Sequence, residues 1–88
     1  MTYRIHRSKQ PGAIVFALSG VLDADLAARL EPLLASESDG SIVLDLKDVT
    51  LVDRTAVRFL AAVEATGTQI VNCPEYVRIW IVAESDSP

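Results

Sequence analysis

Four aspartates could supply chemistry in this sequence: Asp23, Asp45, Asp48 and Asp53. Each lies near the end of a predicted strand, where functional groups gather in a mostly parallel sheet. Carboxylates grouped in this way bind Mg²⁺ or receive a phosphoryl group. One hypothesis is therefore a small Mg²⁺-dependent phosphoryl-transfer site built on Asp23, Asp48 and Asp53. The interpretation that we favour is that Asp23 and Asp53 cap helices and that the other two are solvated loop residues.

The other reactive side chains are isolated in the sequence. Cys73 precedes a predicted helix, whose start lowers a thiol pKa, but it is the only cysteine and has no catalytic base nearby. We interpret it as a structural thiol and the single histidine, His6, as a solvated strand residue. The chain has no phosphate-binding glycine loop and no pair of His or Cys at metal-ligand spacing. We therefore expect no catalytic residue, no metal and no cofactor.

The junction around Asp53 is the most informative stretch, because a strand is predicted to give way there to a helix. A helix start presents unpaired backbone N–H groups and a positive dipole end, which suit an anion. A nucleotide- or anion-binding site at the Asp53–Ala56 helix start, aided by Arg54, is thus a second hypothesis.

The outward face of the helix that follows forms a flat surface edged by two arginines. Small residues let another backbone approach closely, and arginine is enriched at protein interfaces. Alanine is also the best helix former, so the same pattern fits an ordinary exposed face. The sequence leaves both explanations open for this set: Arg54, Arg58, Ala61, Ala62 and Ala65.

The composition bounds the protein class. The 88 residues carry a net charge of −4, and half of them are hydrophobic. An acidic chain without clustered Lys or Arg is not suited to nucleic acid or anionic membranes. A lone cysteine fits a reducing compartment, and neither a signal-peptide core nor an apolar run near the ~20 residues of a membrane span is present. We expect a cytoplasmic protein that contacts neither nucleic acid nor membrane.

Hydrophobic periodicity predicts a single α/β domain over residues 1–88, with its core at about 2–84 and a tail at 85–88. The first two strands should form an antiparallel hairpin, the first at the sheet edge and the second buried on both faces. Later strand–helix–strand units should add parallel strands, giving a mixed sheet of about four strands packed with about three helices. We expect strands at 2–8, 13–18, 41–46 and 68–73, and helices after Asp23, after Asp53 and at 74–84.

Three local features accompany these elements. Pro32 falls within the first helix and should kink it or weaken its last turn. Gly67 should close the second helix in a left-handed conformation. Residues 74–84 fit either a helix or a strand. We predict a helix, because Pro74 and Glu75 suit a helix start.

The order of these motifs resembles the STAS domain, the fold of bacterial anti-sigma factor antagonists. The resemblance runs over residues 13–82 and rests on Gly20-x-Leu22-Asp23, the strand residues 42–46 (IVLDL), and Val52-Asp53 at a helix start. It implies a non-enzymatic switch that binds an anti-sigma factor with kinase activity. That kinase phosphorylates the serine directly after the aspartate of an Asp-Ser-Ser/Thr-Gly motif, and the added charge disrupts the interface.

Here the motif reads Asp53-Arg54-Thr55-Ala56, so the usual acceptor position holds an arginine without a hydroxyl. Conventional switching at residue 54 is chemically impossible. Thr55 retains the second hydroxyl and is the remaining candidate for phosphorylation, although it is not the usual acceptor. Asp53 matches the motif.

Members of the STAS family, which this sequence resembles, often continue past the third helix with a further strand and helix. We therefore expect apolar surface near residues 77–82 to be uncovered, which favours a homodimer or a stable partner. The candidate oligomer contacts are Tyr76, Ile79, Trp80 and Val82.

The leading hypothesis is a non-catalytic protein–protein interaction module in a bacterial regulatory assembly that lacks the usual serine switch. Its partner would be an anti-sigma factor, a related kinase or another regulatory protein. The predicted contact residues are Asp23, Asp53, Arg54, Thr55, Arg58, Ala61 and Ala62.

Overall fold

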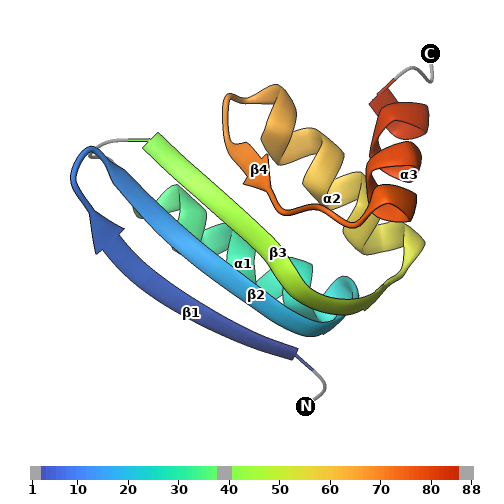
Figure 1. The fold of residues 1–88 in the computed structure, drawn as a ribbon, viewed down its shortest axis with the longest axis horizontal. Coiled ribbons are helices and arrows are strands. Elements are labelled where there is room, and N and C mark those ends of the chain that lie inside the picture. The colour runs from blue at the N-terminus through green and yellow to red at the C-terminus, as the bar shows by residue number, and fades with distance from the viewer. Residues whose placement is uncertain (1–2, 38–40, 86–88) are drawn as a thin grey trace.

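The protein folds as a four-stranded mixed sheet with three helices (Figure 1). The computed structural model describes residues 3–37 and 41–85, so part of the predicted polar loop at 36–40 and most of the predicted tail lie outside it. The elements are β1 (Tyr3–Gln10), β2 (Ala13–Leu22), α1 (Ala24–Ala35), β3 (Ser41–Val52), α2 (Arg54–Ala65), β4 (Gln69–Val71) and α3 (Glu75–Ser85).

The sheet has the predicted topology. Its order is β1-β2-β3-β4, with β1 antiparallel to β2 at one edge. The β2–β3 and β3–β4 pairs are parallel. The prediction of an antiparallel hairpin followed by parallel strands is therefore confirmed, as is the α/β class.

The prediction that the second strand is buried on both faces is wrong. Phe16 and Leu18 are each 1% exposed, whereas Val15 and Ala17, which alternate with them along the strand, are only half-buried. This alternation arises because the helices cover one face of the sheet, and α1 lies behind it in Figure 1. The core therefore lies between this face and the helices, and the opposite face is open.

β2 and β3 run farther than the sequence indicated, to Leu22 and Val52 instead of residues 18 and 46. Two register shifts between them absorb extra residues of β3, so polar side chains can point outward inside the strand. At the first shift, the Asp45 carboxylate accepts a hydrogen bond from the backbone N–H of Lys47 at 2.9 Å. The polar pair after residue 46 marks a bulge, and only Asp53 separates β3 from α2.

Pro32 does not weaken the last turn of α1. The helix continues to Ala35, and the Ser36 N–H donates to the Pro32 carbonyl at 3.1 Å. The proline side chain is exposed on the solvent side, where only its own N–H is lost. Leu33, placed by periodicity among the core leucines, is 41% exposed, while Leu26 and Leu30 are fully buried.

Gly67 ends α2 as predicted. It has φ 106°, and its N–H donates to the Glu64 carbonyl while the Thr68 N–H donates to the Val63 carbonyl.

The following strand β4 is shorter than the predicted 68–73. It stops at Val71 because Asn72 adopts φ 54°, a left-handed conformation that ends sheet pairing.

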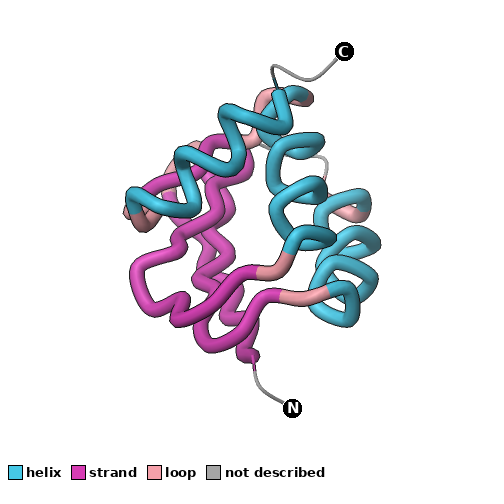
Figure 2. Tube along the Cα trace, turned by 90° about the vertical axis from the view of Figure 1, so that its right-hand side faces the viewer, coloured by secondary structure: helices cyan, strands magenta, loops and turns pink. Residues whose placement is uncertain are grey.

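The last element is a helix, as predicted, and it packs mainly on α2 instead of on the sheet. Its Val77 and Ile81 are fully buried. The Arg78 guanidinium donates to the Glu64 carboxylate at 2.8 Å and ties α3 to the end of α2. In Figure 2, α3, the helix that leads to the C-terminus, crosses the upper end of the strands, whereas α1 and α2 lie to the right of them.

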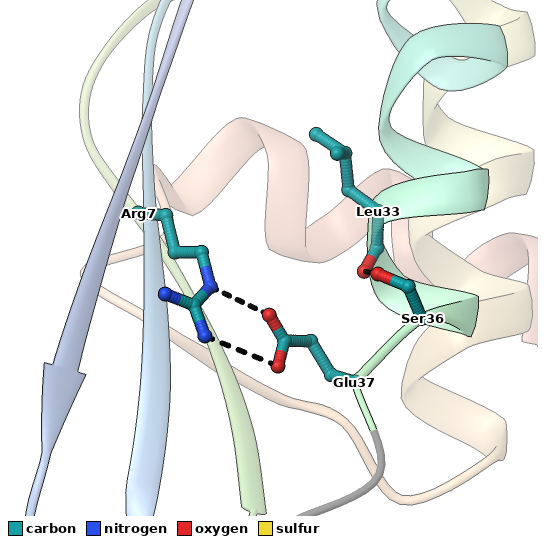
Figure 3. Close-up of polar contacts among 4 residues, drawn as sticks. All are labelled: Arg7, Leu33, Ser36 and Glu37. Carbon is teal, nitrogen blue, oxygen red and sulfur yellow. Dashed lines mark hydrogen bonds and ion pairs between the residues drawn. The ribbon is translucent and has the colours of Figure 1, made fainter.

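A bidentate ion pair between Arg7 and Glu37 joins the edge strand β1 to the end of α1 (Figure 3). Arg7 Nε lies 2.5 Å from Glu37 Oε1, and Arg7 Nη2 lies 3.3 Å from Oε2. The hydrogen bond from Arg7 holds the pKa of Glu37 below the ordinary glutamate value of 4.5. The pair thus stabilises the fold only while Glu37 is ionised.

We expect Glu37→Gln to lower the free energy of unfolding slightly at neutral pH and to have less effect in acid. The stabilisation is complete above the unfolded pKa and disappears as the pH falls through the lower folded pKa, below 4.5. Urea unfolding at several pH values measures it. Glu31→Gln, an exposed α1 control, should show no such trend, and a Glu37→Gln deficit that stays constant into acid would contradict the assignment.

Candidate functional site

Two helix starts lie side by side at one end of the sheet. Leu22 and Val52 are neighbours in the paired strands β2 and β3, and each precedes the aspartate that caps a helix. The Asp53 N–H also donates to the Leu22 carbonyl at 3.0 Å, which fixes the two corners against each other. The structure thus brings Asp23 and Asp53 together, as the sequence predicted.

Both aspartates act as N-caps. Asp23 Oδ1 accepts from the Leu26 N–H at 3.0 Å, and Asp53 Oδ1 accepts from the Ala56 N–H at 2.9 Å. Each carboxylate thereby satisfies an otherwise unpaired donor and neutralises the positive helix end. This arrangement weighs against the anion-binding hypothesis, because the Asp53 carboxylate occupies the position that a bound anion needs.

The arginines that follow Asp53 face outward and bracket one acidic residue of α3. The Nε atoms of Arg54 and Arg58 lie 3.7 and 3.6 Å from Glu84 Oε1, and their side chains are 78% and 59% exposed. Exposed pairs at this separation contribute little to stability. The guanidinium groups therefore remain available to an outside partner at small cost.

The remaining predicted contact residues lie on the same side of α2. Thr55 and Ala62 are exposed, and Ala61 is half-buried against the core. We use the name corner surface for the predicted set, which runs from the start of α1 along the outward face of α2: Asp23, Asp53, Arg54, Thr55, Arg58, Ala61 and Ala62.

Two shallow hollows flank Glu84 where α3 crosses α2. One, of about 290 Å³, is lined by Arg54, Trp80, Ala83 and Glu84. The other, of similar volume, is lined by Arg58, Ala61, Ala62, Ala65 and Glu84. The outward face of α2 is therefore a grooved surface shared with α3, and not the flat one that the sequence indicated.

The predicted oligomer contacts are exposed on α3. Tyr76, Ile79, Trp80 and Val82 have 40%, 59%, 46% and 47% of their surface accessible. Tyr76 and Trp80 stack edge to face with ring centres 5.7 Å apart. The uncovered apolar surface expected near residues 77–82 is present, although Val77 and Ile81 are buried.

The structure does not bring the aspartates together as a metal site. Asp45 and Asp48 belong to the middle of β3, beside Ala17 and Ser19 of β2, whereas Asp53 follows the strand. Within residues 3–37 and 41–85, no three Asp, Glu, His or Cys side chains are grouped to hold a metal ion. The Mg²⁺ site built on Asp23, Asp48 and Asp53 is therefore not formed, because bulges lengthen β3 beyond the predicted end.

Cys73 is half-buried and unpaired with any other cysteine. Burial raises the pKa of its thiol, and its Sγ lies 3.5 Å from the Pro74 carbonyl oxygen. A thiol with a raised pKa is a poor nucleophile at neutral pH. These observations agree with a structural role.

Sequence reasoning missed two residues of this region. Glu84 joins α3 to Arg54 and Arg58, and this pairing depends on the crossing of two helices that no sequence spacing reveals. Leu51 is 56% exposed next to the corner because the second bulge of β3 turns it outward. An irregular strand gives no periodic signal for such a side chain.

The fold and site together define a small α/β domain with two capped helix starts on one edge and a helix-lined outer surface. A family model described as "Mlab, STAS domain" matches residues 5–71. The chain belongs to the STAS domain family. The resemblance inferred from Asp23, residues 42–46 and Asp53 is thereby confirmed.

Solved structures support the same fold. The crystal structure of an antisigma-factor antagonist, a STAS domain from Rhodobacter sphaeroides, has a TM-score of 0.57 and 13% sequence identity. The match covers 98% of this chain and 94% of that one. Among curated proteins, none matches this chain.

The STAS domain family is generally non-catalytic. Among the described helices, none is long and apolar enough to cross a membrane.

Proposed function

We propose that this chain is a non-catalytic adaptor that binds a regulatory protein through the corner surface, constitutively and in the cytoplasm. The partner is an anti-sigma factor, a related kinase or another regulatory protein. The single observation that carries the proposal is Arg54. It is 78% exposed at the first position of α2, where the family motif carries the phosphorylated serine.

The charge of this position supports constitutive binding. A phosphorylated serine would add negative charge beside the Asp53 carboxylate, whereas Arg54 carries a permanent positive charge. A guanidinium that is held by a long, exposed pair to Glu84 can exchange that pair for a partner carboxylate. We infer that the partner presents an acidic or hydrogen-bond-accepting group to Arg54.

Control through Thr55 is the alternative to constitutive binding at this surface. Thr55 is exposed at the second position of α2, one turn before Arg58. A phosphate there would compete with Glu84 for Arg58 and would repel the acidic group that Arg54 attracts. Modification of Thr55 would therefore weaken partner binding, in place of the serine switch.

We expect Arg54→Glu to abolish capture of the partner from native cells while the domain stays folded. The substitution reverses the charge at an exposed position and removes one long ion pair, so its cost in stability is small. Affinity capture with quantitative mass spectrometry compares the proteins retained by the wild type and the variant. Circular dichroism monitors the fold.

Arg4→Glu is the matched control, because Arg4 is also an exposed arginine but belongs to the edge strand β1. It makes the same change in net charge away from the corner surface and should leave capture intact. If Arg54→Glu retains the same proteins as the wild type, or if both variants lose them equally, the corner surface is not the binding site.

A further inference from the structure

Helix α3 has two apolar stripes, and only one of them is covered within the described chain. Val77 and Ile81 are fully buried against α2. The other stripe follows the i, i+3, i+4, i+7 spacing of a helix face and is largely exposed. It consists of four residues that we call the α3 stripe: Tyr76, Ile79, Trp80 and Ala83.

We propose that the α3 stripe packs against the α3 stripe of a second copy of this chain, as an antiparallel pair related by a two-fold axis. This contact goes beyond the proposed function, because it requires no partner at the corner surface. An axis between Ile79 and Trp80 places Ile79 of one copy against Trp80 of the other. The same symmetry sets Tyr76 opposite Ala83, so a large side chain faces a small one at both ends.

The hollow beside Ala83 matches this arrangement. It has a volume of about 290 Å³, and its walls are Arg54, Trp80, Ala83 and Glu84. Tyr76 of the second copy enters it from above Ala83, where the methyl side chain leaves room for a ring. Its hydroxyl can donate to the Glu84 carboxylate, and its ring joins the edge-to-face pair that Tyr76 and Trp80 form at 5.7 Å.

The charges of this surface do not oppose a second copy. Whole chains repel each other, because each carries a net charge of −4. Helices α2 and α3, however, carry three arginines and three glutamates and are neutral in sum. Two copies can thus approach through this surface without net repulsion, and the antiparallel arrangement keeps the two Glu75 side chains at opposite ends.

The exposed area indicates a weak dimer. The accessible parts of Tyr76, Ile79, Trp80 and the adjacent Val82 amount to about 400 Å² per copy, or about 800 Å² in a pair. Stable interfaces bury at least about 1,200 Å², and smaller ones are transient. The dimer should therefore form only at high protein concentration and exchange rapidly with monomer.

Analytical ultracentrifugation of the full chain over a range from low micromolar to near-millimolar concentration tests this contact. The wild type should shift from monomer towards dimer mass as its concentration rises. Ile79→Glu, which sets two carboxylates together at the axis, should remain a monomer throughout, and Trp80→Ala should weaken the shift. Leu33→Glu is the matched control, because Leu33 is an exposed leucine on α1 and its change should leave the shift intact.

Mixing experiments identify the occupant and its direction. Ile79→Glu and Ile79→Lys chains should each be monomeric alone and should pair when mixed. In a Cys73→Ser background, Tyr76→Cys and Ala83→Cys chains should form a mixed disulfide, whereas two Ala83→Cys chains should not. A wild type that remains monomeric at the highest concentration overturns the proposal. The proposal is also overturned if Leu33→Glu loses the shift towards dimer mass as fully as Ile79→Glu does. Disulfides between two Ala83→Cys chains would overturn it as well.

Discussion

Replacing Leu60 with alanine is expected to lower the free energy of unfolding by about 3 kcal/mol, the largest effect of any single change considered for this chain. Leu60 is fully buried in the core between α2 and the sheet. Its truncation removes transfer free energy and leaves a cavity that a tightly packed core fills only in part. A domain of this size has a total stability of about 5–10 kcal/mol, so much of the reserve is lost.

Urea unfolding followed by circular dichroism measures this effect. Leu51→Ala is the matched control, since the same atoms are removed from a side chain that is 56% exposed, and it should change the stability by less than about 1 kcal/mol. Equal losses for the two variants would show that α2 is not packed on the sheet as described. Leu60→Ala should also weaken partner capture in proportion to its unfolded fraction, unlike Arg54→Glu, which should abolish capture in a folded domain.

Removing both helix caps together, as Asp23→Ala with Asp53→Ala, should cost about 2 kcal/mol. Each carboxylate satisfies one backbone donor at 3.0 or 2.9 Å, and loss of an N-cap costs about 1 kcal/mol. The two caps lie at neighbouring strand ends joined by the Asp53–Leu22 hydrogen bond, and the expected cost is the one that applies when their effects add. The two single variants and the double variant form a cycle that measures any coupling between the caps.

The control for the caps is the pair Asp23→Ser with Asp53→Ser, because a serine hydroxyl accepts the same backbone hydrogen bond without the charge. Most of the stability should return. If the serine variants are as unstable as the alanine variants, the carboxylate charge acts by some means other than capping. Partner capture by the Asp53→Ser variant then separates the structural role of Asp53 from any direct contact.

Much of the fold could be predicted because its elements have local signals. Asp23 and Asp53 mark helix starts, Gly67 marks a helix end, and alternation identified the edge strand. The order of strands and helices then restricted the sheet topology. The family motif added the STAS fold, which the comparisons confirm.

The errors arise where the local pattern does not determine the conformation of the chain. Lys47 and Asp48 looked like the end of a strand, but bulges against β2 turn polar side chains outward and let β3 continue. Asn72 ended β4 early by adopting a left-handed conformation that its residue type permits without requiring. Pro32 is harmless because it is exposed on the solvent side of α1.

The sequence could place the residues at the two helix starts, but not the contacts between α2 and α3. The corner residues follow from the two helix starts, so Asp23, Asp53, Arg54 and Thr55 could be placed together from sequence. The ion pairs to Glu84 and the hollow beside Trp80 arise from the crossing of α2 and α3. No sequence period encodes the angle at which two helices cross.

The central claim is that the corner surface binds its partner without a phosphorylation switch. The most direct measurement is the intact mass of the chain isolated from native cells in two pools, one bound to the captured partner and one free. The account predicts the same unmodified mass in both pools, because Arg54 replaces the usual acceptor. A phosphate on Thr55 that is present in the free pool and absent from the bound pool would contradict constitutive binding.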